Sequence, residues 1–212
     1  MSKFDEWRDD HQEFEFDYHA ADNYRWHDEQ FVPAWRENFE TFLGLRPDEF
    51  DDADILLDVG SGSRSALAAY FTRGVIHNIE PLGDRYLTIP EVARYWTPEL
   101  RATLHSQPAE RVVPELVGRC ALVVCWNVLD HVFEWRSVLS NVLDYARPGG
   151  IVALCSDTKA HGRGHPGIDD PAEMIERIAD SMEIVRFEFN YGKTVVRDFA
   201  AKLYRTTGET TR

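Results

Sequence analysis

Apolar segments with strand-like and helix-like patterns alternate along the chain from residue 54 onward. Short apolar runs predict buried strands at 55–59, 75–79, 102–105, 121–126 and 151–155. Apolar positions three or four residues apart predict helices at 66–71, 90–100, 135–143 and from residue 171. Strands that alternate with helices indicate a parallel sheet with helices on both faces.

The two ends of the chain have different patterns. Strands predicted at 183–189 and 194–204 are joined by residues 190–193, and so short a connection implies an antiparallel hairpin. Near the N-terminus, aromatic residues three or four positions apart predict the core-facing side of one helix: Phe31, Trp35, Phe39 and Phe42. Pro33 fits the first turn of this helix, and Gly44 fits its C-terminal cap.

These elements predict an α/β fold of the doubly wound, Rossmann-like type. We expect a mostly parallel seven-stranded sheet that ends in an antiparallel hairpin and carries an N-terminal helical extension. The predicted organisation is an extension or lid at 1–50, a cofactor-binding domain at 51–206 and a disordered tail at 207–212.

Composition limits the classes of protein that need to be considered. The 212 residues are 43% apolar and 28% charged, which is enough for one core of ordinary size. The net charge of −14 repels phosphate backbones, so a nucleic-acid partner is not expected. No apolar run approaches the roughly 20 residues that cross a bilayer, and the three cysteines form no CxxC pair. We therefore expect a cytoplasmic protein with reduced thiols and no membrane partner; the composition does not predict an oligomeric state.

A glycine-rich loop joins the first predicted strand to the first predicted helix of the sheet. Gly60 and Gly62 let the backbone approach a ligand closely at the carboxyl edge of the sheet. Glu80 ends the second strand about 20 residues further on, where a carboxylate accepts hydrogen bonds from both hydroxyls of a ribose. The combination predicts a site for a cofactor that contains a nucleoside.

Asp58, directly before the glycines, discriminates between two such cofactors. Its carboxylate would repel the diphosphate of a dinucleotide, whereas it would attract the sulfonium and ammonium groups of S-adenosylmethionine. Arg64 is the feature that favours a phosphate ligand instead, because a guanidinium binds phosphate well.

Three stretches of this sequence resemble the class I S-adenosylmethionine-dependent methyltransferases: LLDVGSGS at 56–63, HNIEPLGDRY at 77–86, and the strand, NVLDH, helix and RPGG pattern at 121–154. The resemblance spans roughly residues 54–205. It implies S-adenosylmethionine as the cofactor, methyl transfer as the activity, and a fold that ends in an antiparallel hairpin.

The same resemblance implies which residues contact the cofactor. Asp58 and the Gly60-Ser61-Gly62 loop would border the methionine part, Glu80 would bind the ribose, and Trp126 and Asn127 would lie beside the sulfonium. The family often has an Asp that binds the adenine amine where this sequence has Ser106–Glu110. Gln107, Glu110 or backbone atoms would therefore have to bind the amine instead. The full implied set is Asp58, Gly60, Ser61, Gly62, Glu80, Pro81, Leu82, Gln107, Ala109, Glu110, Trp126 and Asn127.

Candidate catalytic groups are histidines that follow predicted strands. Methyl transfer is an in-line displacement, and a base is needed only when the acceptor is a hydroxyl or a charged amine. His131 follows the fourth strand and is the first candidate, although it would also suit packing or capping of the next helix. His161 and His165, on a glycine-rich loop, are candidates for a basic role or ordinary loop residues. No carboxylate set accompanies them, so no metal is predicted.

The sequence favours a methyltransferase that acts on a small polar metabolite, such as a sugar, a nucleotide-sugar or a natural-product intermediate. A protein or peptide methyltransferase is the first alternative. An NAD-dependent oxidoreductase is another, although Ser65 stands where GxGxxG has its third glycine. A non-catalytic binding module is the last alternative.

Aromatic and histidine residues before the sheet would form a lid or simply pack on it: Phe14, Phe16, Tyr18, His19, Tyr24, Trp26 and His27.

Overall fold

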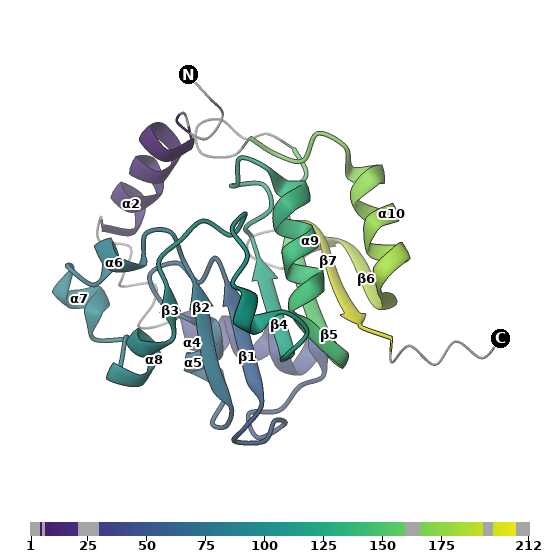
Figure 1. The fold of residues 1–212 in the computed structure, drawn as a ribbon, viewed down its shortest axis with the longest axis horizontal. Coiled ribbons are helices and arrows are strands. Elements are labelled where there is room, and N and C mark those ends of the chain that lie inside the picture. The colour runs from purple at the N-terminus through teal and green to yellow at the C-terminus, as the bar shows by residue number, and fades with distance from the viewer. Residues whose placement is uncertain (1–4, 6, 21–29, 160–165, 193–196, 207–212) are drawn as a thin grey trace. The chain divides into compact units, whose positions relative to one another are not determined.

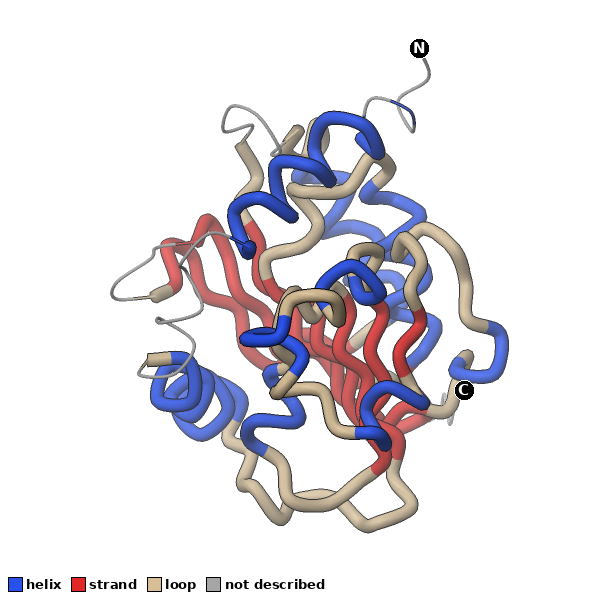
Figure 2. The backbone as a smooth tube through the Cα atoms, turned by 90° about the vertical axis from the view of Figure 1, so that its left-hand side faces the viewer, coloured by secondary structure: helices blue, strands red, loops and turns tan. Residues whose placement is uncertain are grey.

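The fold is described from a computed structural model (Figure 1), which places residue 5 and residues 7–20, 30–159, 166–192 and 197–206. The chain divides into two compact units, Met1–Ala109 and Glu110–Arg212. Figure 2 shows the strands in red and the helices in blue.

The first unit is built on parallel strands. Residue Ile55 of β1 lies opposite Val75 of β2, and Asn78 of β2 lies opposite Leu104 of β3. The strands are β1 (Ile55–Val59), β2 (Val75–Ile79) and β3 (Leu104–His105). The helices are η1 (Trp7–His11), α2 (Gln12–Ala20), α4 (Phe31–Glu37), η2 (Asn38–Leu43), α5 (Ala66–Tyr70), α6 (Gly83–Tyr86), α7 (Pro90–Ala93) and α8 (Pro98–Ala102).

The second unit contains parallel and antiparallel strand pairs. Strand β4 runs parallel to β5, and β7 runs antiparallel to both β5 and β6. The strands are β4 (Cys120–Trp126), β5 (Ala146–Ser156), β6 (Glu183–Tyr191) and β7 (Arg197–Tyr204). The helices are η3 (Pro114–Leu116), α9 (Trp135–Tyr145) and α10 (Pro171–Ser181).

Among the described residues, seven strands follow the order β3-β2-β1-β4-β5-β7-β6. The sheet is mostly parallel, and its antiparallel member β7 comes from the closing hairpin. This arrangement confirms the predicted Rossmann-like α/β class. The predicted division at residues 50 and 206 stays a prediction, and the tail 207–212 lies outside the described residues.

Several element boundaries differ from the sequence expectation. Ala102, expected in the third strand, belongs to α8, so β3 begins at Leu104. The helix expected over 90–100 is split into α7 and α8, because Pro98 cannot continue a helix and Thr97 caps the new one with its side chain. Strand β5 begins at Ala146 rather than 151. Its register against β4 shifts between Cys120 and Leu122, which accommodates the Arg147–Gly150 segment as a bulge.

The predicted helix at Phe31 is confirmed and continues into η2. Its aromatic stripe is buried at Phe31, Phe39 and Phe42, and Trp35 stacks on Phe39 with ring centroids 5.4 Å apart. Gly44 ends the segment in the left-handed conformation at φ 65°, as its capping position predicts. No described helix is long and apolar enough to cross a membrane.

The bulge at the start of β5 provides a stability test. A Cβ added to Gly150 would lie 2.7 Å from the Cys120 carbonyl oxygen and 2.8 Å from that of Arg147, both backbone atoms. We expect Gly150→Ala to lower the free energy of unfolding by about 2 kcal/mol, measured by urea denaturation. Gly118→Ala is the matched control, with a positive φ of 69° and nothing within 4 Å. It should cost only about 1 kcal/mol, and equal losses in the two variants would contradict the close approach.

Candidate functional site

The loop between β1 and α5 has the conformation that its glycines predict. Gly60 and Gly62 adopt φ values of 70° and 62°, a region that side chains with a Cβ rarely adopt. The Gly60 amide donates to the Ile79 carbonyl at 2.8 Å, and the Trp96 indole donates to the Ser63 carbonyl at 3.0 Å. The Ser61 hydroxyl oxygen is buried and finds no hydrogen-bond partner in the described part of the chain. The loop is therefore held in shape at both ends, with an unused polar group in its middle.

Glu80 connects this loop to the segment that follows β2. Its Oε2 accepts from the Gly62 amide at 2.8 Å, and its Oε1 accepts from the Leu82 amide at 3.0 Å. Burial raises the pKa of this carboxyl to about 7, against the opposing effect of the two amides. Each oxygen retains further acceptor capacity, so the carboxylate can take two more donors from neighbouring hydroxyls.

Asp58 occupies the N-terminus of α5. Its Oδ2 accepts from the Ser65 hydroxyl and from the Ala66 amide, both at 2.9 Å. Burial raises the pKa of Asp58 to about 6, and these hydrogen bonds oppose the rise. An anion of the protein itself therefore takes the place at which a dinucleotide diphosphate would bind, which argues against a phosphate ligand at this loop.

Arg64 is accounted for by aromatic packing. Its guanidinium carbon lies 4.8 Å from the ring centroid of Phe31 and 4.3 Å from that of Tyr95. These are distances at which a cation is attracted to a ring face. The phosphate-binding alternative for Arg64 therefore has no geometric support.

The residues expected near the adenine have mixed environments. Leu82 is buried in an apolar cluster with Tyr86, Val92 and Trp96, and Ala109 is also buried. Pro81 is partly exposed, and the backbone amide of Gln107 donates to the His105 carbonyl at 2.8 Å. The residues expected near the adenine in the first unit therefore include buried apolar side chains as well as a polar one.

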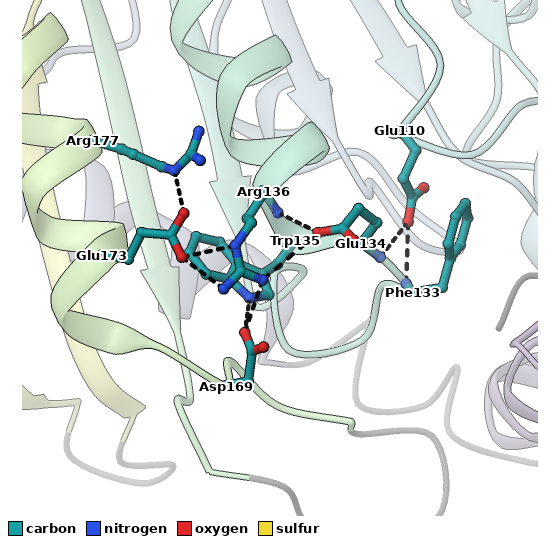
Figure 3. A network of polar contacts seen from close by, with 8 residues as sticks. All are labelled: Glu110, Phe133, Glu134, Trp135, Arg136, Asp169, Glu173 and Arg177. Atoms are coloured by element: carbon teal, nitrogen blue, oxygen red, sulfur yellow. Dashed lines mark hydrogen bonds and ion pairs between the residues drawn. The ribbon is translucent and has the colours of Figure 1, made fainter.

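Glu110, in the second unit, supports the turn before α9 (Figure 3). Its Oε1 accepts from the Phe133 amide at 3.1 Å and from the Glu134 amide at 3.3 Å. Its Oε2 is buried without a hydrogen-bond partner among the residues described, and burial raises the pKa of the carboxyl. One oxygen thus has a structural role, and the other can accept from a ligand.

The carboxyl end of β4 carries a second polar group of residues. Asn127 adopts a positive φ of 61°, which is uncommon for a residue other than glycine and occurs often at functional sites. Its Nδ2 lies 3.2 Å from Nε2 of His131, and its buried Oδ1 has no partner in the described ranges. Trp126 meets the ring of Tyr191 edge to face, with centroids 5.6 Å apart.

Asp130 completes this group with a negative charge. Its Oδ2 lies 3.6 Å from Nε2 of His131, and its Oδ1 accepts from the Ser156 hydroxyl at 2.7 Å. Asp130 is fully buried, whereas the His131 side chain is 15% exposed. A buried carboxylate and a partly exposed imidazole therefore lie side by side at this end of β4, an arrangement that suits a general base.

Sequence reasoning missed several members of the second group. Asp130 adjoins His131 in the sequence, which was a usable signal, but nothing local indicated Ser156 or the packing of Tyr191 on Trp126. Arg197 forms an ion pair with Asp157 at 2.6 Å next to Ser156, and these two residues were also missed.

A charged network joins the start of α9 to the start of α10 (Figure 3). Asp169 accepts from the Trp135 indole at 2.6 Å and from Arg136 at 3.0 Å, and Arg136 also pairs with Glu173. Asp170 caps α10 by accepting from the Glu173 amide at 2.9 Å. The network fixes the chain where it enters α10.

Some candidates fall outside what the structure describes. His161 and His165 are among the undescribed residues, as are Tyr24, Trp26 and His27 of the N-terminal group. The described residues contain no cluster of three or more His, Cys, Asp or Glu side chains able to hold a metal ion.

The strand order, the glycine loop and the acidic residue after β2 together define the class I S-adenosylmethionine-dependent methyltransferase fold. The sequence matches the family described as "Methyltransferase domain" over residues 25–193, and the chain belongs to this family. A search of curated proteins found no match.

Solved structures share the fold at low sequence identity. The N-methyltransferase NodS from Bradyrhizobium japonicum, solved with S-adenosyl-L-homocysteine, is 13% identical, with a TM-score of 0.60 over 92% of this chain and 97% of that one. The 1,6-didemethyltoxoflavin-N1-methyltransferase of Burkholderia thailandensis is 16% identical, with a TM-score of 0.56 over 85% and 80%. A 16S rRNA (adenine(1408)-N(1))-methyltransferase from Catenulisporales acidiphilia is 17% identical, with a TM-score of 0.53 over 74% and 88%.

The protein is therefore an S-adenosylmethionine-dependent methyltransferase. The residues of the first unit fit this cofactor: the buried Glu80 carboxylate can accept from ribose hydroxyls, and the buried Ser61 hydroxyl lacks a partner among the described residues. The cofactor supplies a methyl group activated by its bond to a sulfonium. The protein therefore has to bind the cofactor and the acceptor, orient them for transfer, and exclude water from the site.

Proposed function

We propose that this methyltransferase acts on a small polar metabolite, such as a sugar, a nucleotide-sugar or a natural-product intermediate. The observation that carries the proposal is the polar group at the end of β4, where Asn127, Asp130 and His131 offer hydrogen-bonding and proton-accepting groups. One structural neighbour, a methyltransferase solved with 1,6-didemethyltoxoflavin bound, agrees with an acceptor of this size.

An RNA acceptor is the competing candidate because one structural neighbour is an rRNA methyltransferase. A net charge of −14 opposes it, since each phosphate contact needs a Lys or Arg to replace counterions. A protein or peptide acceptor is the other alternative. The charge of the chain does not oppose a basic peptide, so the acceptor screen must include one.

The geometry of the first unit supports a set of proposed cofactor contacts. Glu80 accepts hydrogen bonds from the ribose hydroxyls, and the backbone of Gly60-Ser61-Gly62 borders the methionine part. Asp58 favours the positively charged sulfonium and ammonium groups through its charge, while it caps α5. Pro81, Leu82, Gln107 and Ala109 are assigned to the adenine side, and Glu110, Trp126 and Asn127 stay predictions for the remaining contacts.

His131 is proposed as the base that takes the proton from a hydroxyl or ammonium acceptor. The imidazole gains a positive charge when it accepts this proton, and the Asp130 carboxylate at 3.6 Å stabilises that charge. The Asn127 amide restrains the ring through its contact with Nε2. The edge-to-face rings of Trp126 and Tyr191 provide an aromatic wall that excludes water.

The proposal is tested in two steps. Calorimetry with S-adenosylhomocysteine and, separately, NADH first establishes the cofactor, and only the first should bind. Transfer of labelled methyl from S-adenosylmethionine is then measured on four acceptor pools: sugars and nucleotide-sugars, small amines, a basic peptide, and total RNA. Transfer to one of the small-molecule pools supports the proposal. Transfer confined to the peptide or the RNA overturns it.

Binding of the cofactor should depend on pH through Glu80. Hydroxyl donors bind the ionised carboxylate better, so binding lowers a pKa of about 7, releases a proton and strengthens as pH rises. Because ionisation rises from about a tenth at pH 6 to about nine tenths at pH 8, the affinity for S-adenosylhomocysteine should increase about tenfold over this range. Calorimetry in two buffers of different ionisation enthalpy measures the proton released; constant affinity would contradict this role for Glu80.

A further inference from the structure

Helix α2 has two distinct faces in the first unit. One face is exposed to solvent and consists of Glu13, Phe14, Asp17 and Tyr18. The other is buried or partly buried and consists of Gln12, Glu15 and Phe16, with His11 just before the helix. Residues three and four positions apart share a helix face, so this division shows which side of α2 faces the rest of the unit.

The helix is fastened to α6, the segment that begins just after Glu80 and Leu82. The ring of Phe16 stacks on that of Tyr86 with centroids 5.9 Å apart and an interplanar angle of 15°. Arg85 donates to both carboxylate oxygens of Glu13, at 2.5 and 3.1 Å, and its guanidinium lies 3.8 Å from the Phe16 ring. Figure 1 shows α2 beside α6. The inner face of α2 is therefore held close to the Glu80 end of the glycine loop.

The buried side of this helix is more polar than packing requires. Gln12 is only 9% exposed, and its Oε1 has no hydrogen-bond partner among the described residues. Nδ1 of His11 is also buried without a partner in that set. The charge of Glu15 lies near enough to Glu80 to contribute to the raised pKa of Glu80. Burying polar groups without partners costs free energy, so a helix held by packing alone would present apolar side chains here.

We propose that the polar inner face of α2, formed by His11, Gln12 and Glu15, is part of the cofactor site and binds hydroxyl and ammonium groups of S-adenosylmethionine beside Glu80. The proposal rests on the proposed role of Glu80. Gln12 and His11 supply hydrogen bonds that they do not make within the described protein, and Glu15 adds a negative charge. The ion pair Glu13–Arg85 and the stack Phe16–Tyr86 position this face.

The charge of Glu15 has a measurable consequence. S-adenosylmethionine carries a sulfonium charge that S-adenosylhomocysteine lacks, so a nearby carboxylate favours the first ligand. Glu15→Gln should therefore weaken S-adenosylmethionine binding more than S-adenosylhomocysteine binding, by about threefold in the ratio of the two dissociation constants. An unchanged ratio would remove Glu15 from the site.

Gln12→Leu tests the hydrogen-bonding part, with Phe14→Leu on the outer face of α2 as the matched control. We expect Gln12→Leu to weaken S-adenosylhomocysteine binding by about tenfold in calorimetry, because a hydrogen bond to the ligand is lost. Its melting temperature without cofactor should be unchanged or higher, because an unpaired buried amide has been removed. Phe14→Leu should leave the affinity unchanged.

Other outcomes would overturn either the inference about α2 or the proposed cofactor site. If Gln12→Leu binds S-adenosylhomocysteine like the unaltered protein while Glu80→Ala does not bind it, the inner face of α2 only packs, and the inference fails alone. If the unaltered protein binds no S-adenosylhomocysteine, the proposed cofactor site fails and the inference with it. A fall in melting temperature in Gln12→Leu would show a structural role for Gln12, and would also contradict the inference.

Discussion

Glu80→Ala is expected to weaken the binding of S-adenosylhomocysteine by about a hundredfold or more. The substitution removes the acceptor for two ribose hydroxyls, each a charge-assisted hydrogen bond. It also removes the acceptor that joins the Gly62 amide to β2, so that the loop loses a restraint on its bound conformation. Titration calorimetry at pH 8, where the carboxylate is mostly ionised, measures the effect at its largest.

Two further variants make this result specific. Glu91→Ala changes an exposed carboxylate on α7 and should leave the affinity unchanged. Glu80→Gln retains one oxygen to accept from a backbone amide and should bind more tightly than Glu80→Ala but more weakly than the unaltered protein. An affinity within threefold of the unaltered protein in both Glu80 variants would exclude Glu80 as the ribose ligand.

His131→Ala is expected to lower turnover by about 10²- to 10⁴-fold, the usual contribution of a general base. The affinity for S-adenosylhomocysteine should stay within a few-fold, because His131 is assigned to the acceptor side. The measurement is the initial rate of methyl transfer to the acceptor identified by the screen, at saturating cofactor. The calorimetric affinity of the same variant shows that the cofactor part of the site remains formed.

Asp130→Asn separates the base from its positioning group. The carboxylate 3.6 Å from Nε2 of His131 is lost while the ring remains, so turnover should fall and the affinity for S-adenosylhomocysteine should stay within a few-fold. If His131→Ala transfers methyl groups at close to the normal rate, the ring has no role as a base. It then serves only to pack and to contact Asn127.

The sequence pattern predicted the features that depend on neighbouring residues, namely the strands and the conformation of the glycine loop. Strand β4 is a continuous apolar run, whereas β1 and β2 are mainly apolar but contain Asp58, and His77 and Asn78, respectively. All three strands were located to within a residue. The positive φ of Gly60 and Gly62 follows from glycine between a strand and a helix. The class, the fold and the cofactor are confirmed.

Contacts between distant positions could not be predicted in the same way. Arg64 is explained by Phe31 and Tyr95, which are far from it in sequence, and no periodicity pairs them. The contact of Tyr191 with Trp126 depends on how β6 and β4 are arranged in the second unit. The sequence predicted that the charge of Asp58 would repel a diphosphate. The structure adds that the Asp58 carboxylate itself caps α5, at the position where a diphosphate would bind.

The most direct measurement of the central claim is a crystal structure of the protein with S-adenosylhomocysteine. The account predicts both ribose hydroxyls within about 3.2 Å of the Glu80 carboxylate oxygens, the distance of an ordinary hydrogen bond. It also predicts that Asp58 still accepts from the Ala66 amide in the complex. A ribose bound away from Glu80, or a phosphate held at Gly60 and Gly62 in place of the nucleoside, would contradict it.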